Sequence, residues 1–516
     1  PAEKLLNHGL ILPILLPFIA GIALLLLGET PSMRWRLDPR RLSLSSVALL
    51  LPVALLLLAR ASTGTYATYA LGHWPAPFGI LLVLDRCSAL LLLLVALVAL
   101  AALLHALATG SDRRGRWFHA LFQFQLMGLN GAFLAGDLFN LFVFFEILLI
   151  ASYGLLLHGG GAARLRAGLH YVILNLAGSA LFLIAIATLY GTTGALNFAD
   201  LAQRIATAPT ETAGLLRAGA LLLLVVFGLK AAILPLYCWL PAAYASSSAP
   251  VAALFALLTK VGVYAILRIT TLLFGSDAGP AAQVLAPWLL PLGLTTLLAG
   301  ALGMLASAEL RRLLAYGVIV SIGTLLIGLG LDSSAGLGAA LVYLVHTTLI
   351  GAGMFLLADL IAAQRGHLDH RPAAPLVQPA LLGGLFLAGA IAMAGLPPLS
   401  GFFGKLLLLR AATDSATLPW IWGGILGSGL LVIIALSRSG SALFWLPATA
   451  ATVNTASAPI RQWLPAAALL AAAPLLILFG QPLLDFATAT AQQLREPAGY
   501  IHAVLGDPAV ATVVLP

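Results

Sequence analysis

Three lysines lie deep inside long apolar runs. They are Lys230 in FGLKAAILP, Lys260 in ALLTKVGVY and Lys405 in SGFFGKLLLL. A charge at the centre of a bilayer costs at least ~2.5–3.5 kcal/mol, so such residues pair with one another or line a hydrated path. Lysine also differs from arginine, because a buried ammonium can lose its proton whereas a guanidinium cannot. The three positions therefore indicate proton transfer.

Arginine supplies almost all the other positive charge. Of the 26 basic residues only one further lysine, Lys4, is present, and it stands near the start of the sequence. Lys260 is about ten residues from either end of its run, roughly 15 Å along a helix, which is too far for its stem to reach water. Lys230 is nearer an end and could reach it in part. Arginine outside the runs and lysine inside them is the pattern expected of a proton path.

Glu146, in NLFVFFEILLIASY, is the one deep acidic residue, and His346, in LVYLVHTTLIG, is about equally deep. Glu146 has two interpretations: a neutral acid bonded to a neighbouring helix, or an ion pair or relay with the lysines, which we favour. His346 is either a structural histidine or a proton relay, and its depth favours the relay. Asp137 and Asp359 are further candidates for proton access, although Asp137 is predicted to be a solvated helix cap. Histidines 105, 119, 158 and 170 are predicted to lie at the membrane interface.

The composition excludes a water-soluble enzyme. Of 516 residues, 61% are apolar and only 9% are charged, against ~25% charged in soluble domains. Cys87 and Cys238 have no metal-ligand or redox spacing, so no zinc, iron–sulfur or other cofactor is predicted. The net charge of +8 comes from arginines dispersed between apolar runs, which favours a membrane protein over a partner of nucleic acid.

The predicted fold is an all-α polytopic membrane protein with about fourteen spans. Their approximate limits are 9–27, 43–58, 88–108, 117–135, 138–157, 169–190, 215–237, 250–273, 286–306, 313–331, 337–361, 380–410, 420–437 and 463–480. The segment after the last span, from Leu484 to Pro516, is predicted to be a short external amphipathic stretch.

Arginines between the spans predict the orientation. They follow the odd-numbered spans, at positions 34, 36, 40, 41, 113, 114, 116, 164, 166, 311, 312, 365, 371, 438 and 461. Asp137, Asp200, Glu211, Asp277, Asp332 and Asp414 stand in the even-numbered links. By the positive-inside rule the odd-numbered links are cytoplasmic and both termini are periplasmic, which suits a bacterial inner membrane.

Prolines interrupt two of the lysine-bearing spans. Pro235 and Pro241 follow Lys230, and Pro397 and Pro398 precede Lys405. One such span in each half of a chain is typical of inverted-repeat transporters. We therefore divide the chain into spans one to three (1–116), two inverted five-helix repeats (117–273 and 286–437, spans 4–8 and 9–13), and a final part with a loop, span fourteen and the tail (438–516).

Several long segments resemble the antiporter-like subunits of multisubunit cation/proton antiporters and respiratory complex I, above all the D-type subunits of the Mrp (or Pha) antiporters. They are GDLFNLFVFFEILLIASYGLLLHGG, FGLKAAILPLYCWLPAAYASSSAPVAALFALLTKVGVYAILR, AGLPPLSGFFGKLLLL and YIHAVLG. The resemblance implies that Glu146 pairs with Lys230, and that these residues form a hydrated chain along the membrane midplane with Lys260 and Lys405. It also implies exchange of H⁺ for Na⁺ or K⁺, and partner subunits of the A, B, C, E, F and G type in the lipid bilayer.

Two departures from that family lie in the second half. Many members have a lysine in span eleven a few residues after the histidine, where this sequence has Gly351. In span ten Ser321 stands near a position that is polar or histidine in the family. His346 is therefore expected to be the main titratable link in that half.

Three functions are compatible with the sequence. The first is a proton-translocating antiporter subunit, which is a transporter and not an enzyme. The second is a proton-pumping subunit of complex I or of a membrane-bound hydrogenase. The third is a structural scaffold, which explains neither the deep lysines nor the repeat. We favour the first function because spans five and twelve carry the segments that resemble the D-type antiporter subunits.

Overall fold

The protein is a bundle of helices with one short hairpin. The computed structural model describes residues 8–28, 38–446 and 456–506, so Lys4, Arg34 and Arg36 lie outside the described residues. The strands are β1 (Ala67–Ala70) and β2 (Leu81–Leu84). The helices are η1 (Gly9–Ile11), α2 (Leu12–Leu27), α3 (Pro39–Ser62), η2 (Leu71–His73), α4 (Arg86–Thr109), η3 (Ser111–Arg113), α5 (Phe118–Leu134), α6 (Leu138–Leu157), α7 (Ala162–Thr193), α8 (Phe198–Ala206), η4 (Thr210–Thr212), α9 (Ala213–Ala231), η5 (Leu236–Trp239), α10 (Leu240–Ser246), α11 (Ala249–Phe255), α12 (Leu258–Arg268), η6 (Ile269–Leu273), η7 (Gly279–Ala281), α13 (Ala286–Ala306), α14 (Leu310–Gly330), α15 (Ser334–Arg365), α16 (Pro379–Ala394), α17 (Ser400–Ala411), α18 (Leu418–Trp445), α19 (Ile460–Leu470), α20 (Ala472–Leu478), α21 (Gly480–Arg495) and α22 (Pro497–Leu505).

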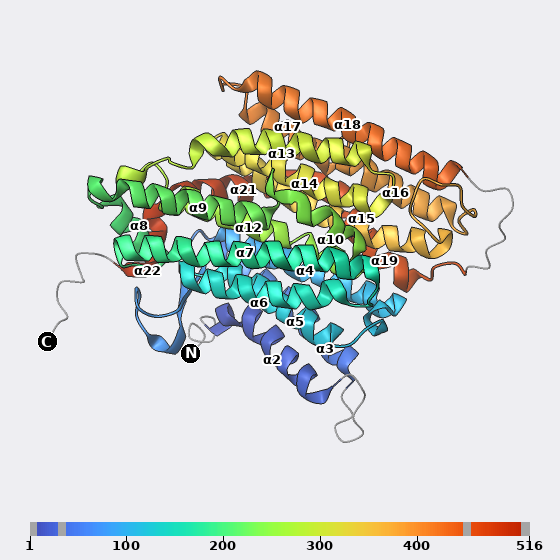
Figure 1. Ribbon diagram of the computed structural model, residues 1–516, viewed down its shortest axis with the longest axis horizontal. Coiled ribbons are helices and arrows are strands. Elements are labelled where there is room, and N and C mark those ends of the chain that lie inside the picture. Colours follow the sequence, from blue (N-terminus) through green and yellow to red (C-terminus); the bar gives the residue numbers. More distant parts are fainter. Residues whose placement is uncertain (1–7, 29–37, 447–455, 507–516) are drawn as a thin grey trace.

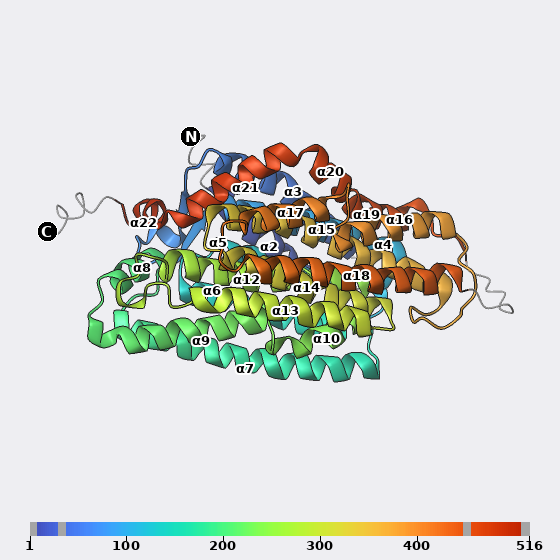
Figure 2. The ribbon, with the colours of Figure 1, turned by 90° about the horizontal axis from the view of Figure 1, so that it is seen from above.

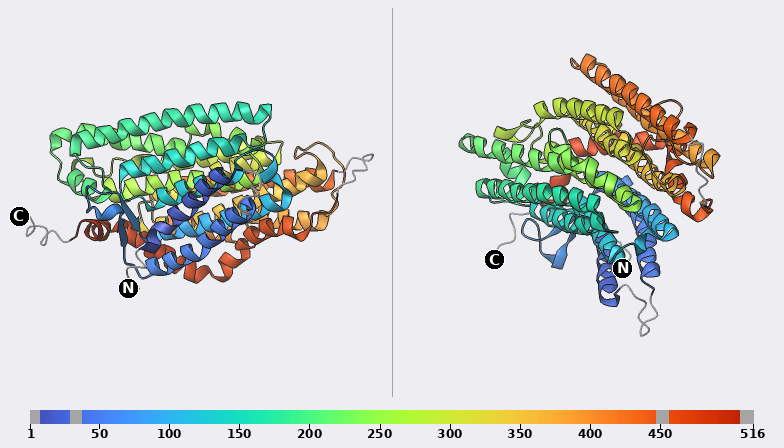
Figure 3. Two further views of the ribbon diagram at one scale, coloured as in Figure 1. Left: turned by 90° about the horizontal axis from the view of Figure 1, so that it is seen from below. Right: turned by 45° about the vertical axis from the view of Figure 1, so that its right-hand side comes forward.

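The long helices run side by side along the horizontal axis of Figure 1. Seen from above, α7 lies along one face, and α20 and α21 lie along the opposite face (Figure 2). The views in Figure 3 show the same alignment of the helices from two other directions. The predicted fold class, an all-α polytopic membrane protein, is confirmed.

Twelve helices or helix groups among the described residues are long and apolar enough to cross a membrane. The other two predicted spans coincide with shorter helices: α5 has 17 residues, and the interrupted pair α16 and α17 has 16 and 12. Each of the fourteen predicted segments therefore coincides with a helix or an interrupted helix. The second, predicted as short, is the 24-residue α3.

The two spans predicted to be broken are interrupted. α9 ends at Ala231, four residues before Pro235, and α16 ends at Ala394, with Pro397 and Pro398 before α17. Pro241 differs, because it lies in the first turn of α10, where a missing N–H leaves no bond unmade. A third interruption, between α11 and α12, separates Phe255 from Leu258 without any proline, and the sequence predicted one continuous span there.

The segment after span fourteen was predicted to be a short external amphipathic stretch, and its described part packs against the bundle. α21 packs along α15 and α4. Its buried residues Ala487, Ala491 and Leu494 recur at the spacing of one helix face, so that face is covered by the bundle. The gap at 59–87 likewise contains structure, the antiparallel β1–β2 hairpin.

A pair of backbone clamps recurs in the two halves of the bundle. In the first half, Leu138 N donates to Leu196 O and Phe198 N donates to Gly136 O. In the second half, the N–H of residue 310 donates to the oxygen of residue 368, and the N–H of residue 370 donates to the oxygen of residue 308. Each of these residue numbers is 172 higher than its counterpart in the first half. Each clamp precedes the second helix of its half, α6 or α14, and follows the third, α7 or α15. Because one lies in an even-numbered link and the other in an odd-numbered link, the two clamps are expected at opposite ends of the bundle.

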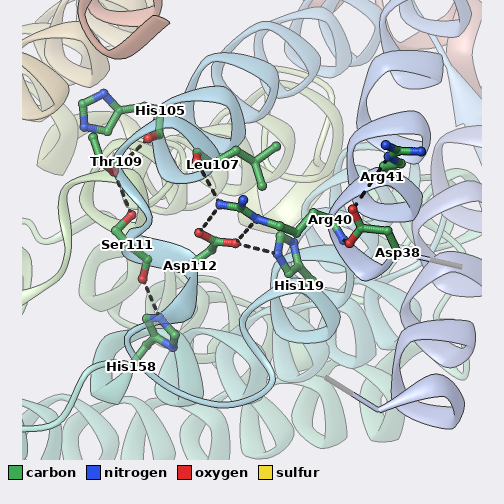
Figure 4. Close-up of polar contacts among 10 residues, drawn as sticks. All are labelled: Asp38, Arg40, Arg41, His105, Leu107, Thr109, Ser111, Asp112, His119 and His158. Atoms are coloured by element: carbon green, nitrogen blue, oxygen red, sulfur yellow. Dashed lines mark hydrogen bonds and ion pairs between the residues drawn. The ribbon is translucent and has the colours of Figure 1, made fainter. Parts of the chain in front are cut away.

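An ion-pair cluster fastens the ends of α3, α4 and α5 (Figure 4). Arg40 donates to both carboxylate oxygens of Asp112, at 2.7 and 2.8 Å, and His119 Nε2 lies 3.1 Å from Asp112 Oδ2. Burial would raise the pKa of Asp112, but the hydrogen bonds from His119 and Arg40 outweigh burial and hold the pKa at about 2. The carboxylate is thus fixed in its ionised form between two donors.

The Asp112 cluster gives a pH-dependent prediction. Because the folded pKa of about 2 lies below the ordinary value of 3.8, its contribution to stability is complete above about pH 4 and is lost as the pH falls toward 2. Asp112→Asn should lower the melting temperature of the detergent-solubilised protein at pH 7, by an amount equivalent to about 2 kcal/mol. The difference from the wild type should shrink below about pH 4. Asp414→Asn, at an exposed carboxylate, is the matched control, and a pH-independent difference for Asp112→Asn would contradict the prediction.

Candidate functional site

The predicted titratable residues lie on five different helices of the bundle. Glu146 is on α6, Lys230 on α9, Lys260 on α12, His346 on α15 and Lys405 on α17. In both Figure 1 and Figure 2, α12 and α15 lie between α6 and α17. Packing is continuous along this series, from α6 through α7, α9, α12, α14 and α15 to α17.

Glu146 is half-buried and is held by the neighbouring helix α7. Ser179 donates a short hydrogen bond from its hydroxyl to Glu146 Oε1. Glu146 forms no direct ion pair with Lys230 among the described residues, in contrast to the contact that the family resemblance implies.

Lys230 lies in the last turn of α9, beside the interruption of its span, and is 4% exposed. Its Nζ donates to Asn175 O at 3.3 Å and to Asn175 Oδ1 at 3.4 Å. Asn175 and Ser179 are one helical turn apart on α7, so they present their polar groups on one face. That turn of α7 therefore connects Glu146 to Lys230.

Lys260 lies in the first turn of α12, directly after the break that separates α11 from α12, and is 1% exposed. Its Nζ donates to Ser321 Oγ on α14 at 3.0 Å. Gly262 allows α12 to approach α9 here, because a Cβ at this position would lie 2.5 Å from the backbone nitrogen of Ala231. The close approach brings the helix ends that carry Lys230 and Lys260 together.

His346 shares a small cavity of about 20 Å³ with Lys260. This volume is about what one water molecule requires. His346 Nδ1 lies 2.7 Å from Ser400 Oγ, at the start of α17. Gly351 lines the same cavity, and a Cβ added to Gly351 would meet no atom within 4 Å.

Lys405 bonds to a backbone carbonyl at the end of α16, where the second interrupted span is broken. Its Nζ donates to Ala394 O, the last residue of α16, at 3.0 Å. A cation is favoured there because the C-terminal end of a helix carries partial negative charge. Gly395, which follows, has φ +78°, and a Cβ there would lie 2.7 Å from the Lys405 side chain.

The two aspartates stand at helix ends. Asp137 caps α6 by accepting from the backbone N–H of Asn140 at 2.6 Å, as predicted, but it is 9% exposed rather than solvated. Burial raises the pKa of Asp137 to about 6. Asp359 lies near the end of α15, 3.1 Å from His105 Nε2. His105, which was predicted to lie at the membrane interface, is fully buried near the end of α4.

Sequence reasoning missed three residues that bond to the titratable groups. Asn175 and Ser179 contact Lys230 and Glu146, and Ser400 contacts His346. The available signal was the pair of polar residues at a spacing of four within the apolar run LNLAGSAL. Within residues 8–28, 38–446 and 456–506, no group of three or more His, Cys, Asp or Glu could hold a metal ion.

The arrangement defines a class of protein: a polytopic membrane protein with a row of buried titratable groups. Residues 135–433 match the family described as "NADH:quinone oxidoreductase/Mrp antiporter, TM". A relative in Rhizobium meliloti, named as the D subunit of a probable K⁺/H⁺ antiporter, is 41% identical over 98% of each chain. A relative in Alkalihalophilus pseudofirmus, named as the D subunit of an Na⁺/H⁺ antiporter, is 36% identical over 97% of this chain and all of the relative.

Solved structures agree with the sequence comparison. A chain of the Mrp complex from Dietzia sp. DQ12-45-1b is 28% identical, with a TM-score of 0.84 over 97% of this chain and all of that one. A chain of respiratory complex I from Thermus thermophilus is 27% identical, with a TM-score of 0.76 over 94% and 99%. The chain therefore belongs to the NADH:quinone oxidoreductase/Mrp antiporter family, and the two relatives above are named as D subunits of cation/proton antiporters.

The contact between Ser179 and Glu146 gives a testable prediction. Ser179→Ala should lower the melting temperature of the protein, because a half-buried carboxyl group loses its hydroxyl donor, at a cost of ~1.5–3 kcal/mol if it is ionised. Ser428→Ala is the matched control, since the buried Ser428 hydroxyl donates only within its own helix, to Ile425 O. Equal melting temperatures for the two variants would contradict a supporting role for Ser179.

Proposed function

We propose that this chain is the proton-translocating subunit of a multisubunit antiporter that exchanges H⁺ for Na⁺ or K⁺. Protons would move along a midplane series formed by Glu146, Lys230, Lys260, His346 and Lys405. Family membership and the names of the relatives, one from a K⁺/H⁺ antiporter and the other from an Na⁺/H⁺ antiporter, support the exchange reaction.

The observation that carries the proposal is the kind of partner each buried lysine has. Lys230, Lys260 and Lys405 donate to an amide or carbonyl oxygen, a serine hydroxyl and a backbone carbonyl respectively. An amine still has N–H groups after it loses a proton, so a neutral oxygen accepts a hydrogen bond from either form. A bound carboxylate would favour the ammonium alone. The contacts therefore allow each lysine to gain and lose a proton.

In this mechanism Glu146 and Lys230 act through α7 and not by direct contact. Ser179 and Asn175 hold the two groups from one turn of the same helix. A proton that arrives at Glu146 removes its negative charge, which weakens its hold on a charged Lys230 and favours transfer onward. Lys260 and His346, which line one cavity, are then the next groups across the bundle.

We further propose that 117–273 and 286–437 are inverted repeats, between the parts 1–116 and 438–516. The backbone clamps displaced by 172 residues support this division. Tyr171 bonds to Ser152 at 2.7 Å, and the residues displaced by the same 172 positions, Tyr343 and Thr324, also interact. An inverted repeat places equivalent groups at opposite faces of the membrane.

The proposed setting is a bacterial inner membrane, with the arginine-rich links in the cytoplasm and both termini in the periplasm. The arginine distribution supports this orientation. Other membrane subunits, of the A, B, C, E, F and G type, would complete the complex. The fold shared with complex I supports a respiratory pump less well, because the curated relatives are named as parts of antiporters.

A substitution that keeps the charge tests proton transfer directly. Lys230→Arg should abolish H⁺-coupled exchange by the assembled complex in proteoliposomes, because arginine stays protonated. Glu146→Gln, which removes a titratable group, should have the same effect. Assembly is checked by co-purification of the partner subunits. Exchange at the wild-type rate in either variant would refute the proposed path.

The second half of the path depends on His346. His346→Ala should slow exchange by about 100-fold, the lower range of what a positioned proton donor or acceptor contributes. At Gly351 a Cβ would meet no atom within 4 Å, and Gly351→Lys in the His346→Ala background should restore part of the rate. Normal exchange in His346→Ala would leave this half of the path without its relay.

A further inference from the structure

A second buried histidine lies outside the midplane series. His105, near the end of α4, is fully buried, and its ring bridges α15 and α19. Its Nε2 is 3.1 Å from Asp359 Oδ2, and its Nδ1 is 3.1 Å from the backbone oxygen of Gln462. The proposed path makes no use of this pair.

The two contacts constrain where protons can be. A backbone carbonyl only accepts hydrogen bonds, so His105 Nδ1 must carry a proton to bond to Gln462 O. A carboxylate also only accepts, so an unprotonated Nε2 would direct a lone pair at Asp359 Oδ2. A neutral imidazole beside a carboxylate satisfies only one of the two contacts. One additional proton, between Nε2 and Asp359 Oδ2, satisfies both.

The surrounding charges favour that proton on the histidine. Arg311 donates to the other oxygen of Asp359 at 3.3 Å, and Arg114 also lies within electrostatic range of this carboxylate. Two nearby guanidinium groups favour the ionised carboxylate. When the proton leaves, the pair carries one negative charge, which the arginines stabilise. The pair can therefore release its proton as well as hold it.

The pair is also reachable from outside the bundle. Asp359, Arg114, Arg311 and Gln462 line a cavity of about 300 Å³ at the arginine-rich end. The Asp359 side chain is 16% exposed and the His105 side chain is not exposed. Asp359 thus faces the cavity, while His105 lies behind it.

A nearby histidine–aspartate pair provides a contrast. His119 Nε2 lies 3.1 Å from Asp112 Oδ2, the same separation as in the His105 pair. His119 Nδ1, however, has no hydrogen-bond partner among the described residues. A neutral His119 with its proton on Nε2 satisfies that contact, and Arg40 already neutralises Asp112. No extra proton is needed there.

We propose that His105 and Asp359 form a proton-loading site, through which the chain takes up or releases protons at its arginine-rich end. Uptake adds one proton to Nε2 of a neutral His105, giving an imidazolium beside the ionised Asp359, and release is the reverse. The exchange of this proton with the lysine series rests on the proposed function. Asp359 and Gly351 lie on the same helix, eight residues or ~12 Å apart. The cavity beside Gly351, which Lys260 and His346 also line, is therefore where the proton would reach the lysine series.

Nuclear magnetic resonance of the full complex labelled with ¹⁵N-histidine tests the loading step without any transport assay. His105→Gln identifies the signal. At about pH 7 wild-type His105 should have both ring nitrogens protonated. In Asp359→Asn the amide can donate to Nε2, so His105 should become neutral. A ring that is neutral in the wild type at the same pH, or one that Asp359→Asn leaves unchanged, would overturn the proposal.

Exchange in proteoliposomes tests the use of this site. His105→Gln and Asp359→Asn should each slow exchange by about tenfold or more with an alkaline medium at the arginine-rich face, where protons are scarce, and by less with an acidic one. His119→Gln is the matched control and should exchange normally. Rates for His105→Gln equal to those of the control would overturn the proposal.

The two proposals can fail separately. If Lys230→Arg exchanges normally while His105 titrates as described, the lysine path is wrong and the loading site stands. If Lys230→Arg is inactive but His105 stays neutral, the lysine path stands and the loading site is wrong.

Discussion

Every buried polar group in this bundle needs an oxygen or nitrogen partner, because hydrocarbon offers none. The three deep lysines meet that requirement with neutral oxygens from a neighbouring helix or a helix end. Each lysine also lies beside an interrupted span, and at Lys405 the interruption itself provides the acceptor, Ala394 O. At Lys405 the broken helix therefore satisfies the buried amine directly.

Arginine and lysine are used differently in the described part of the chain. Some arginines bind carboxylates: Arg40 binds Asp112, and the buried Arg268 lies 2.5 Å from Asp85 and over the ring of Tyr264. Fixed pairs of this kind hold helix ends together, and breaking a buried one costs several kcal/mol, ~3–5 in soluble proteins. The lysines lack such counter-ions in direct contact. These arginines are therefore held as fixed cations, whereas the lysines bond to neutral oxygens.

The sequence indicated that the three lysines and His346 lie inside helices away from water, where they are buried, and it predicted two of the three interruptions. Both follow from residue type and position along one helix. It did not predict which side chains touch. Glu146 and Lys230 each bond to α7 and not to each other, and that depends on how three helices are rotated against one another. Likewise His105 lies behind α15 and α19 because those helices pack over the end of α4. Interhelical packing of this kind has no local signal.

The two halves share a backbone hydrogen-bond pattern but differ in the charged groups that they carry. With the displacement of 172 residues seen in the clamps, Glu146 corresponds to Val318 and Ser179 to Gly351. The first half thus has a carboxyl group and its hydroxyl donor where the second has an apolar side chain and open space. Without an acid to balance it, a permanent cation beside Gly351 would be costly. The second half has a histidine and room for about one water there, and both of these groups can be neutral.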